Sequence, residues 1–319
     1  MSSFGDLNRV NTNIQSMDSQ LSLNRINRGL AENQLRMSTG LRINRAEDDA
    51  AGYSIATKLN SRVAGLDQAL QNVGDAKSVL DIAESSFDTI MDNLIEMKGL
   101  ATQAANDTLG DTERGYIGDQ IKSLGDDINE IANQTVFQDF DLLNGTGNTG
   151  SLSLTFQVGE RADDTLVTNI SAVNVGQLFA GSTSGTANLG AATSGGGGVA
   201  DGAAITATSA GSSEQGALAF HDDVTSADFR SFISAIDSAI DGMSERVNDI
   251  GIAQSSLSVR EVTLSQGISA NQSAVSRIMD TDFAKEQSES VRLQILQQTA
   301  TSALAQANMG PQSVLGFLG

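Results

Sequence analysis

Two separate stretches of this sequence keep an unbroken seven-residue repeat, with core-type positions spaced alternately three and four residues apart. The first seam consists of Leu59, Val63, Leu66, Leu70, Val73, Lys77, Leu80, Glu84, Phe87, Met91, Leu94, Lys98, Ala101 and Ala105. The second consists of Ile240, Met243, Val247, Ile250, Gln254, Leu257, Glu261, Leu264, Ile268, Asn271, Val275 and Ile278. A helix with a 3.5-residue apolar repeat keeps its seam dry only by supercoiling around a partner helix. The sequence therefore predicts two long helical arms, each paired with another helix.

Each seam also contains three polar residues. They are Lys77, Glu84 and Lys98 in the first seam, and Gln254, Glu261 and Asn271 in the second. Polar residues at such positions lower stability but fix the register of the pairing. We interpret them as marks of specified pairing, although one arm taken alone is equally compatible with an amphipathic helix of an ordinary globular bundle.

The aromatic content argues against thick globular cores. The chain of 319 residues has 11 Phe, 2 Tyr, no Trp and 1 Pro. Its apolar residues are mostly Ala, Leu, Ile and Val arranged in stripes, which suits long helices with a thin buried layer.

Charge and residue usage exclude several classes of function. The formal net charge of −20 repels nucleic-acid phosphates and anionic lipid headgroups, so we expect no nucleic-acid partner. No window approaches the roughly 18 apolar residues of a membrane span, so we expect no membrane insertion. Without cysteine the chain has no disulfide and no thiolate nucleophile. The amino terminus, MSSFGDLNRVNTNIQS, does not have the pattern of a cleavable secretory signal.

Shorter elements flank the first arm. An apolar stripe from Leu7 to Met37 predicts a terminal helix that ends near Gly40, before turn and capping residues. A further stripe from Ile117 to Ile131 predicts a helix that folds back beside the first arm. The alternating segments SLSLTFQVG and DDTLVTNISAV, separated by GERAD, predict a β-hairpin.

The region between Gly176 and Asp223 is rich in Gly, Ser, Thr and Ala and lacks sustained periodicity. It is either poorly ordered or a small β-rich insert. The helical pattern resumes at Phe229, breaks around MDTDF after Ile278, restarts at Val291 and is expected to end near Pro311.

We therefore predict a mainly α fold. Its N- and C-terminal regions form a long helical hairpin or coiled-coil rod, with a small β-hairpin and a short variable insert. The expected division is an N-terminal inner-core helix (1–40), the N-terminal part of the rod with the β-hairpin (41–175), a variable surface-exposed segment (176–227), a C-terminal rod helix (228–280) and a C-terminal inner-core helix (281–319).

The two ends carry apolar stripes that one thin seam buries only marginally against the entropy of ordering them. We expect the ends to become helical when several copies surround them, so that folding is coupled to assembly. Heterologous contacts of this kind repeat indefinitely and give a filament, that is, a homopolymer. The predicted subunit contacts are Leu7, Val10, Ile14, Met17, Leu21, Leu293, Leu296, Ala300, Leu304, Val314 and Leu315.

We predict no catalytic, cofactor or metal site. His221 is the only histidine, and Gly195 to Gly198 lack the residues that complete a phosphate-binding loop. Acidic pairs such as Asp48 and Asp49 do not have EF-hand spacing. In the elbow between the first two helices, Arg42 and Arg45 could pair with Asp48 and Asp49 or with a neighbouring subunit, and we favour the second.

Three motifs make the ends similar to those of a known family. VNTNIQSM, QLRMSTGLRINRAEDDAAGYSIATKL and the closing DTDFAKEQSESVRLQILQQTATSALAQAN with PQSVLGFL strongly resemble bacterial flagellin. The resemblance covers roughly residues 4–145 and 228–318. It implies a subunit of the bacterial flagellar filament, the propeller for motility, with the terminal helices lining the inner tube and the middle segment facing solvent.

The resemblance also implies several partners and a location. The chain would be exported by the flagellar type III apparatus without a cleaved signal, and it would be extracellular in the filament. A chaperone would hold residues 291–318 before export, and assembly would proceed beneath a cap protein and onto hook-junction proteins.

In some flagellins the segment matching Leu94 to Asn106 is recognised by a Toll-like innate immune receptor. This chain keeps Lys98, Leu100 and Gln103 but has Ile95, Glu96 and Gly99 where strongly recognised flagellins have glutamine, arginine and glutamate. The resemblance therefore implies weak or absent recognition.

Three alternatives remain open at this point. A hook-filament junction protein with related ends belongs to the same class, and the unbroken QILQQTATSALAQAN run favours flagellin over it. A secreted coiled-coil adhesin or binding module predicts a stable, fully helical monomer. An enzyme is disfavoured by the near absence of His and Cys.

Overall fold

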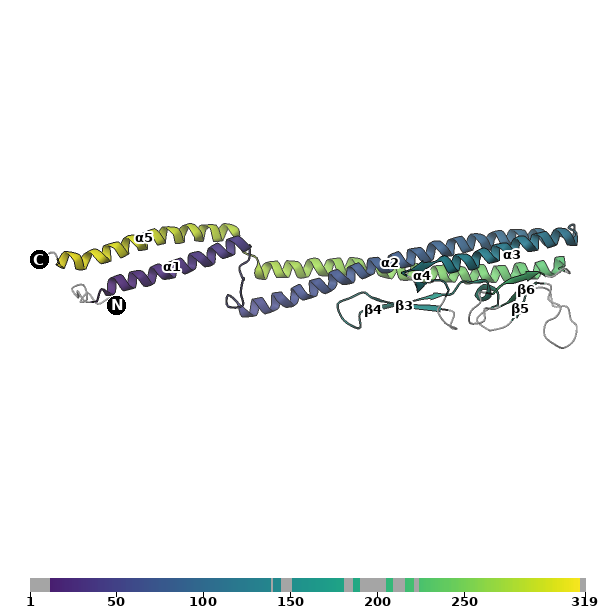
Figure 1. The fold of residues 1–319 in the computed structure, drawn as a ribbon, viewed down its shortest axis with the longest axis horizontal. Coiled ribbons are helices and arrows are strands. Elements are labelled where there is room, and N and C mark those ends of the chain that lie inside the picture. The colour runs from purple at the N-terminus through teal and green to yellow at the C-terminus, as the bar shows by residue number, and fades with distance from the viewer. Residues whose placement is uncertain are drawn as a thin grey trace. The chain divides into compact units, whose positions relative to one another are not determined.

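The computed structural model describes residues 12–138, 140–144, 151–180, 186–189, 205–208, 216–220 and 224–315. Two long helices, α2 (Ala50–Ala104) and α4 (Ser226–Met279), dominate these residues (Figure 1). The chain divides into two compact units, which we call the terminal unit (residues 1–64 and 267–319) and the central unit (residues 65–266). Both α2 and α4 continue from one unit into the other.

In the terminal unit, α1 (Ile14–Thr39) lies beside α5 (Phe283–Leu315) in antiparallel orientation (Figure 1). Helix α1 begins after Asn13, whose side-chain oxygen accepts a hydrogen bond from the Ser16 amide. It ends at Gly40, which has a left-handed φ of 72° that favours glycine. The predicted end near Gly40 is confirmed. The predicted continuous helix from Leu7 is not, because Thr12 and Asn13 are not helical and α1 starts at Ile14, while Leu7 itself lies outside the described residues.

Helix α5 is longer at both ends than the sequence predicted. It begins at Phe283, eight residues before the expected start at Val291, because the Asp282 carboxylate caps it by accepting from the amides of Ala284 and Lys285. It also continues through Pro311 to Leu315, where an end near the proline was expected. The break between α4 and α5 is therefore confined to Asp280–Asp282.

In the central unit, α2 and α4 pair along the two predicted seams, and the seams are confirmed by burial. Every seventh residue from Val73 on α2 and from Met243 on α4 is buried, namely Val73, Leu80, Phe87, Leu94 and Ala101 on α2 and Met243, Ile250, Leu257 and Leu264 on α4. The seam positions between them on α2 are only half-buried. The arms thus form an antiparallel pair with the register that the heptads require.

Four of the six polar seam residues pair with one another across the two arms, whereas Lys98 binds Asp237 outside the second seam and Asn271 donates to the Gly267 carbonyl of its own helix. Lys77 Nζ lies 3.0 Å from Glu261 Oε2, and Gln254 Nε2 donates to Glu84 Oε2 at 2.7 Å. Lys98 Nζ lies 2.6 Å from Asp237 Oδ1. Because a slip of the helices would separate all three pairs, these residues specify one register, as predicted.

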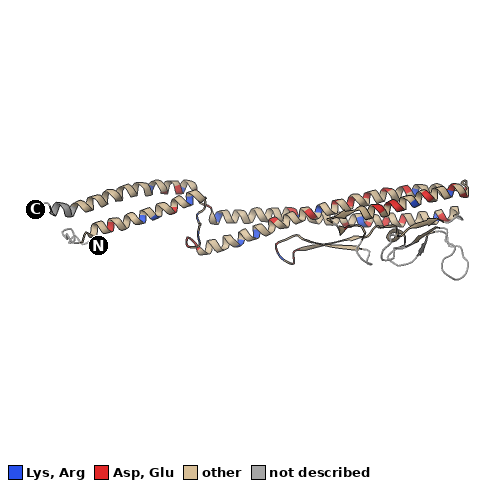
Figure 2. Cartoon of the chain, in the orientation of Figure 1, with Lys and Arg blue, Asp and Glu red and all other residues tan. Residues whose placement is uncertain are grey.

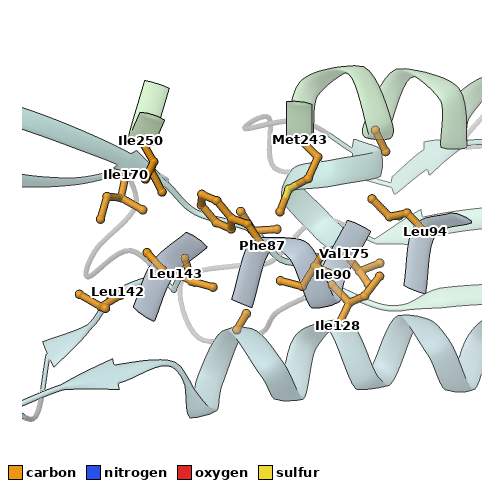
Figure 3. Close-up of a cluster of buried hydrophobic side chains, with 14 of the residues drawn as sticks. Phe87, Ile90, Leu94, Ile128, Leu142, Leu143, Ile170, Val175, Met243 and Ile250 are labelled. Atoms are coloured by element: carbon orange, nitrogen blue, oxygen red, sulfur yellow. The ribbon is translucent and has the colours of Figure 1, made fainter. Parts of the chain in front are cut away.

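Helix α3 (Asp111–Gln134) folds back along α2 as expected, but the core there is thicker than the composition indicated. A second heptad stripe on α2 is also buried, comprising Ala69, Ala76, Ala83, Ile90, Met97 and Ala104. Figure 3 shows why: Ile128 of α3, the loop residues Leu142 and Leu143, and Ile170 gather around Phe87 and Ile90. The expectation of a thin buried layer is therefore wrong for the central unit.

The predicted β-hairpin is present. Strands β3 (Ser151–Gln157) and β4 (Thr165–Ser171) pair antiparallel, with Leu154 opposite Thr168. Two short strands, β1 (Val136–Phe137) and β2 (Phe140–Asp141), also pair antiparallel before the hairpin. Asn72 Nδ2 donates to the Gln157 carbonyl at 3.1 Å and ties the end of β3 to α2.

Within the segment 176–227, the described residues form a π-helical turn, η1 (Gly176–Ala180), and the antiparallel strands β5 (Thr186–Asn188), β6 (Ile205–Thr208) and β7 (Leu218–Phe220). Leu189, Ile205, Ala207 and Leu218 are buried in the core. The expectation that this whole segment faces solvent is therefore wrong for these residues, whereas the alternative of a small β-rich insert describes the strands correctly.

Two glycines of α3, Gly118 and Gly125, allow β7 to pack closely against this helix. A β-carbon at Gly125 would lie 3.1 Å from Leu218 Cδ1, and one at Gly118 would lie 3.2 Å from the Phe220 ring. Asn129, buried on the same helix, donates to the Gly216 carbonyl at 2.9 Å and accepts from the Val175 amide at 3.0 Å. One side chain of α3 therefore binds the backbone both just before the segment 176–227, at Val175, and just before β7, at Gly216.

Candidate assembly surface

The terminal unit buries little of its apolar surface. Asn33 is the buried residue of α1, and Leu293 and Ala307 are the buried apolar residues among the described side chains of α5. Large apolar side chains are instead exposed on both helices, namely Ile14, Met17, Leu21, Leu35, Phe283, Val291, Ile295, Leu296 and Met309. Met17 is 63% exposed and Ile295 is 58% exposed. We call these nine residues the assembly surface.

The predicted contact residues fall into five groups. Ile14, Met17, Leu21 and Leu296 belong to the assembly surface, and Ala300 and Leu304 are half-buried. Leu293 is only 9% exposed, because it packs between the helices with Cδ2 3.7 Å from the position of a β-carbon at Gly29. Leu7 and Val10 lie outside the described residues. Val314 and Leu315 end α5, and their side chains are outside the described part.

A polar cluster holds α1 and α5 together where the apolar contact is thin. Asn33 Nδ2 donates to the carbonyl of Glu286 at 2.9 Å and to its carboxylate at 2.6 Å. Arg36 Nη1 lies 3.8 Å from the other carboxylate oxygen, which also accepts from the Thr281 hydroxyl. This cluster was not predicted from the sequence, although Asn33 continues the three-and-four spacing between Leu30 and Met37.

The elbow, residues 40–49, is held mainly by contacts within the chain. The Arg42 guanidinium donates to the Ile278 carbonyl at 2.7 Å, and the Arg42 amide donates to the Met279 carbonyl at 2.6 Å. Asp49 Oδ1 accepts from the amides of Ala51 and Gly52 and so caps α2. Arg45 pairs with Glu47 at 3.0 Å.

Asp48 closes the elbow turn. Its Oδ2 accepts from the backbone amides of Asn44 and Arg45, both at 2.9 Å. These two hydrogen bonds favour the ionised carboxylate and hold the pKa of Asp48 below its usual value of 3.8, with a smaller contribution from the charges of Arg36 and Arg45. Asp48 and Asp49 thus bind backbone amides, and neither arginine of the expected quartet forms a side-chain ion pair with them within the elbow.

The segment suggested for receptor contact lies on α2. Glu96 and Gln103 are exposed, and Leu100 is half-buried against the core. Lys98 is engaged by Asp237.

The described residues contain neither a metal-ion cluster nor a helix able to span a membrane. No group of three or more His, Asp or Glu side chains in this part of the chain is placed to hold a metal ion. Of the helices described, none combines the length and apolar character needed to cross a bilayer. His221 and the glycines at 195–198 lie outside the described residues.

Long paired helices with exposed apolar side chains on the terminal pair define a mainly α structural protein. Residues 10–148 match the family model of the bacterial flagellin N-terminal helical region, and residues 233–318 match that of the C-terminal helical region.

Individual relatives agree with these matches. Flagellin of Listeria monocytogenes is 31% identical over 304 residues, which cover 95% of this chain and 97% of that protein. Flagellin of Bacillus subtilis is 31% identical over 321 residues, covering 97% and 99%. The flagellar filament 41 kDa core protein of Borreliella burgdorferi is 30% identical over 315 residues, covering 91% and 93%. The chain belongs to the bacterial flagellin family, and it is a structural subunit of the flagellar filament.

Proposed function

We propose that the filament is held together mainly by the assembly surface of α1 and α5, which other copies of the chain cover. The observation that carries this proposal is the poor burial of α1 and α5, where nine large apolar side chains are exposed among those described. Complete burial of one such side chain contributes about 1.5 to 3 kcal/mol. Contacts repeated along a filament would therefore stabilise two helices that are marginal as an isolated pair.

In this arrangement residues 1–40 and 281–319 form the inner core of the filament. Residues 41–175 and 228–280 form the surrounding rod, and 176–227 supplies the variable outer segment. At the elbow, Arg45 is the best placed residue for contact with a neighbouring subunit, because its side chain is 68% exposed while Arg42, Asp48 and Asp49 bind the backbone of their own chain.

The proposal makes the helicity of the ends depend on assembly. We expect circular dichroism to show less helix in the dilute chain than in filaments seeded from it, and limited proteolysis of the dilute chain to remove the ends while leaving the central unit. Equal helicity in the two states would contradict coupled folding. A protease-resistant dilute chain that does not elongate from seeds would favour the binding-module alternative.

Substitutions in the assembly surface test where the copies meet. Met17→Glu and Ile295→Glu place charges on exposed apolar positions, so we expect both to abolish seeded elongation with an unchanged melting temperature of the central unit. The matched control Met17→Leu keeps an apolar side chain of similar size and should elongate like the wild type. Normal elongation of both Glu variants, measured by sedimentation and negative-stain microscopy, would overturn the proposed location.

Family membership supports further partners. We propose that an export chaperone masks the apolar side of residues 291–318, that a cap protein directs assembly outside the cell, and that hook-junction proteins receive the first subunits. Export would proceed without cleavage of a signal. Intact mass of the chain sheared from cells tests the last point, because removal of an N-terminal segment would contradict it. Abundance along the sheared filaments distinguishes a main subunit from a hook-filament junction protein.

We also propose that this chain is a weak ligand of the Toll-like receptor that recognises some flagellins. Glu96 places a negative charge on the exposed face of α2, and Lys98 is already paired with Asp237. A receptor reporter line that responded at nanomolar concentrations of pure monomer would contradict the proposal.

A further inference from the structure

The only proline of the chain lies inside a helix, and it removes one hydrogen bond near the end of α5. Helix α5 runs from Phe283 to Leu315 and includes Pro311. In an α-helix each carbonyl accepts from the amide four residues later, so the donor expected for Ala307 is residue 311. Proline has no amide hydrogen, and Ala307 is only 7% exposed, so water has little access to this residue.

Asn13 supplies the missing donor from the other helix. Its Nδ2 lies 2.8 Å from the Ala307 carbonyl oxygen. Its Oδ1 accepts from the Ser16 amide at 3.0 Å and caps the start of α1. The amide group of one side chain therefore completes both helices, and reversing its orientation would break both hydrogen bonds.

We propose that Asn13 and Pro311 act together as a coupling device, which makes the helical state of the last turns of α5 depend on the folded start of α1. With proline at position 311, the hydrogen-bond ladder beyond Ala307 is incomplete unless Asn13 is present. The two ends of the chain, separated by 294 residues, would thus order together rather than one after the other. Asn13 is a positioning residue for the last turns of α5, and neither it nor Pro311 belongs to the assembly surface.

Four full-length chains test the coupling: the wild type, Asn13→Asp, Pro311→Ala and the double variant. Aspartate keeps an acceptor for the Ser16 amide but cannot donate to Ala307, whereas Pro311→Ala returns the amide that α5 lacks. The measurement is amide hydrogen exchange of residues 304–315, in the dilute chain and in seeded filaments. Asn24→Asp, an exposed change of the same kind on α1, is the matched control.

We expect Asn13→Asp to accelerate exchange of this segment by about twofold to tenfold, as for loss of one hydrogen bond. In the Pro311→Ala background the same substitution should accelerate exchange less than twofold, and Asn24→Asp should have little effect in either background. An equal effect of Asn13→Asp in both backgrounds would show that Asn13 acts only as the cap of α1 and would overturn the coupling. A wild-type segment without protection in both states would overturn it as well.

The exchange measurement in filaments rests on the proposed function, but different results would contradict the proposed assembly and the proposed coupling. A wild-type chain that does not elongate from seeds contradicts the proposed assembly, while exchange in the dilute chain still decides the coupling. Filaments that form normally while the double-variant comparison shows no coupling would contradict only the role of Asn13 and Pro311.

Discussion

Gly52, in the first turn of α2 after the elbow, shows how closely a single residue can be constrained. A β-carbon at this position would lie 2.6 Å from Asp49 Oδ2 and 2.8 Å from Ile43 Cδ1. The Asp49 carboxylate is the cap of α2, and Ile43 is buried, so neither atom moves without loss. Gly74, further along the same helix, has no such neighbour within 4 Å.

We predict opposite effects of alanine at these two glycines. Gly74→Ala should raise stability by up to about 1 kcal/mol, because alanine has the higher helix propensity. Gly52→Ala should lower stability by about 1 kcal/mol or more, because displacing the cap, worth about 0.5 to 2 kcal/mol, and repacking Ile43 outweigh the same gain in propensity. Thermal unfolding followed by circular dichroism measures both, and stabilisation by Gly52→Ala would contradict the described packing.

The ionised carboxylate of Asp48 gives the elbow a dependence on pH. Because the folded-state pKa lies below 3.8, the contribution of Asp48 is present above that pH and is lost as the pH falls through the lowered pKa. We expect amide-exchange protection at Asn44 and Arg45 to persist down to about pH 3.8 and to fall below it. The variant Asp48→Asn has no carboxyl to titrate and should lose this step, and an unchanged pH profile in that variant would contradict the assignment.

At the scale of secondary-structure elements, α2 and α4 make two kinds of seam contact, which contribute differently to the free energy of unfolding. The fully buried heptad positions supply burial, whereas the polar pairs such as Lys77 with Glu261 are partly exposed and contribute at most about 1 kcal/mol each. Stability therefore comes from the apolar positions, and the polar positions decide which register is adopted.

Substitution of Phe87 tests whether the buried apolar seam positions supply most of the stability of the paired arms. It is 1% exposed and is surrounded by residues of α4 and of the strand region (Figure 3). Phe87→Ala should lower the free energy of unfolding by about 3 to 5 kcal/mol. Ile82→Ala, at an exposed position on the same helix, should cost under about 1 kcal/mol. Chemical denaturation of the two variants compares them, and similar losses would contradict the described core.

The sequence period predicted the arms and their register but not everything that covers them. A heptad seam indicates that a helix packs against a partner helix. Val73, Leu80 and Phe87 were predicted as buried contact positions on that basis. The second stripe from Ala69 to Ala104 was not identified, because small residues such as alanine carry little periodic signal. The burial of Ile205 and Leu218 was missed for a related reason, since strands of three or four residues are too short to show a pattern.

Across the whole molecule, the net charge is not shared between the two units. The terminal unit has 11 basic and 10 acidic residues, so its net charge is +1. The central unit has 8 basic and 29 acidic residues, so its net charge is −21. Figure 2 shows Asp and Glu crowded along the helices of the central unit. The ends can therefore pack closely with little charge repulsion, whereas neighbouring central units repel one another.

This distribution predicts that polymerisation depends on salt. Raising the ionic strength from about 0.01 M to about 0.1 M shortens the Debye length from about 30 Å to about 10 Å, so seeded elongation should accelerate. The triple variant Asp88→Asn, Asp92→Asn and Asp249→Asn should show a weaker salt dependence. Asparagine at the exposed serines 85, 255 and 258 is the matched control. Elongation rates of the wild type that do not change with salt would contradict the prediction.

The sequence by itself determined the helical arms, the hairpin, the seam positions of the polar residues and the family. Each of these features depends on local spacing or on contiguous motifs. For the assembly surface it predicted Ile14, Met17, Leu21 and Leu296, which are exposed, together with Leu293, which is buried between α1 and α5. Only the tertiary structure decided which apolar residues remain uncovered and that Asn13 completes the helix of Pro311. Such contacts join residues that are hundreds of positions apart, and no local period encodes them.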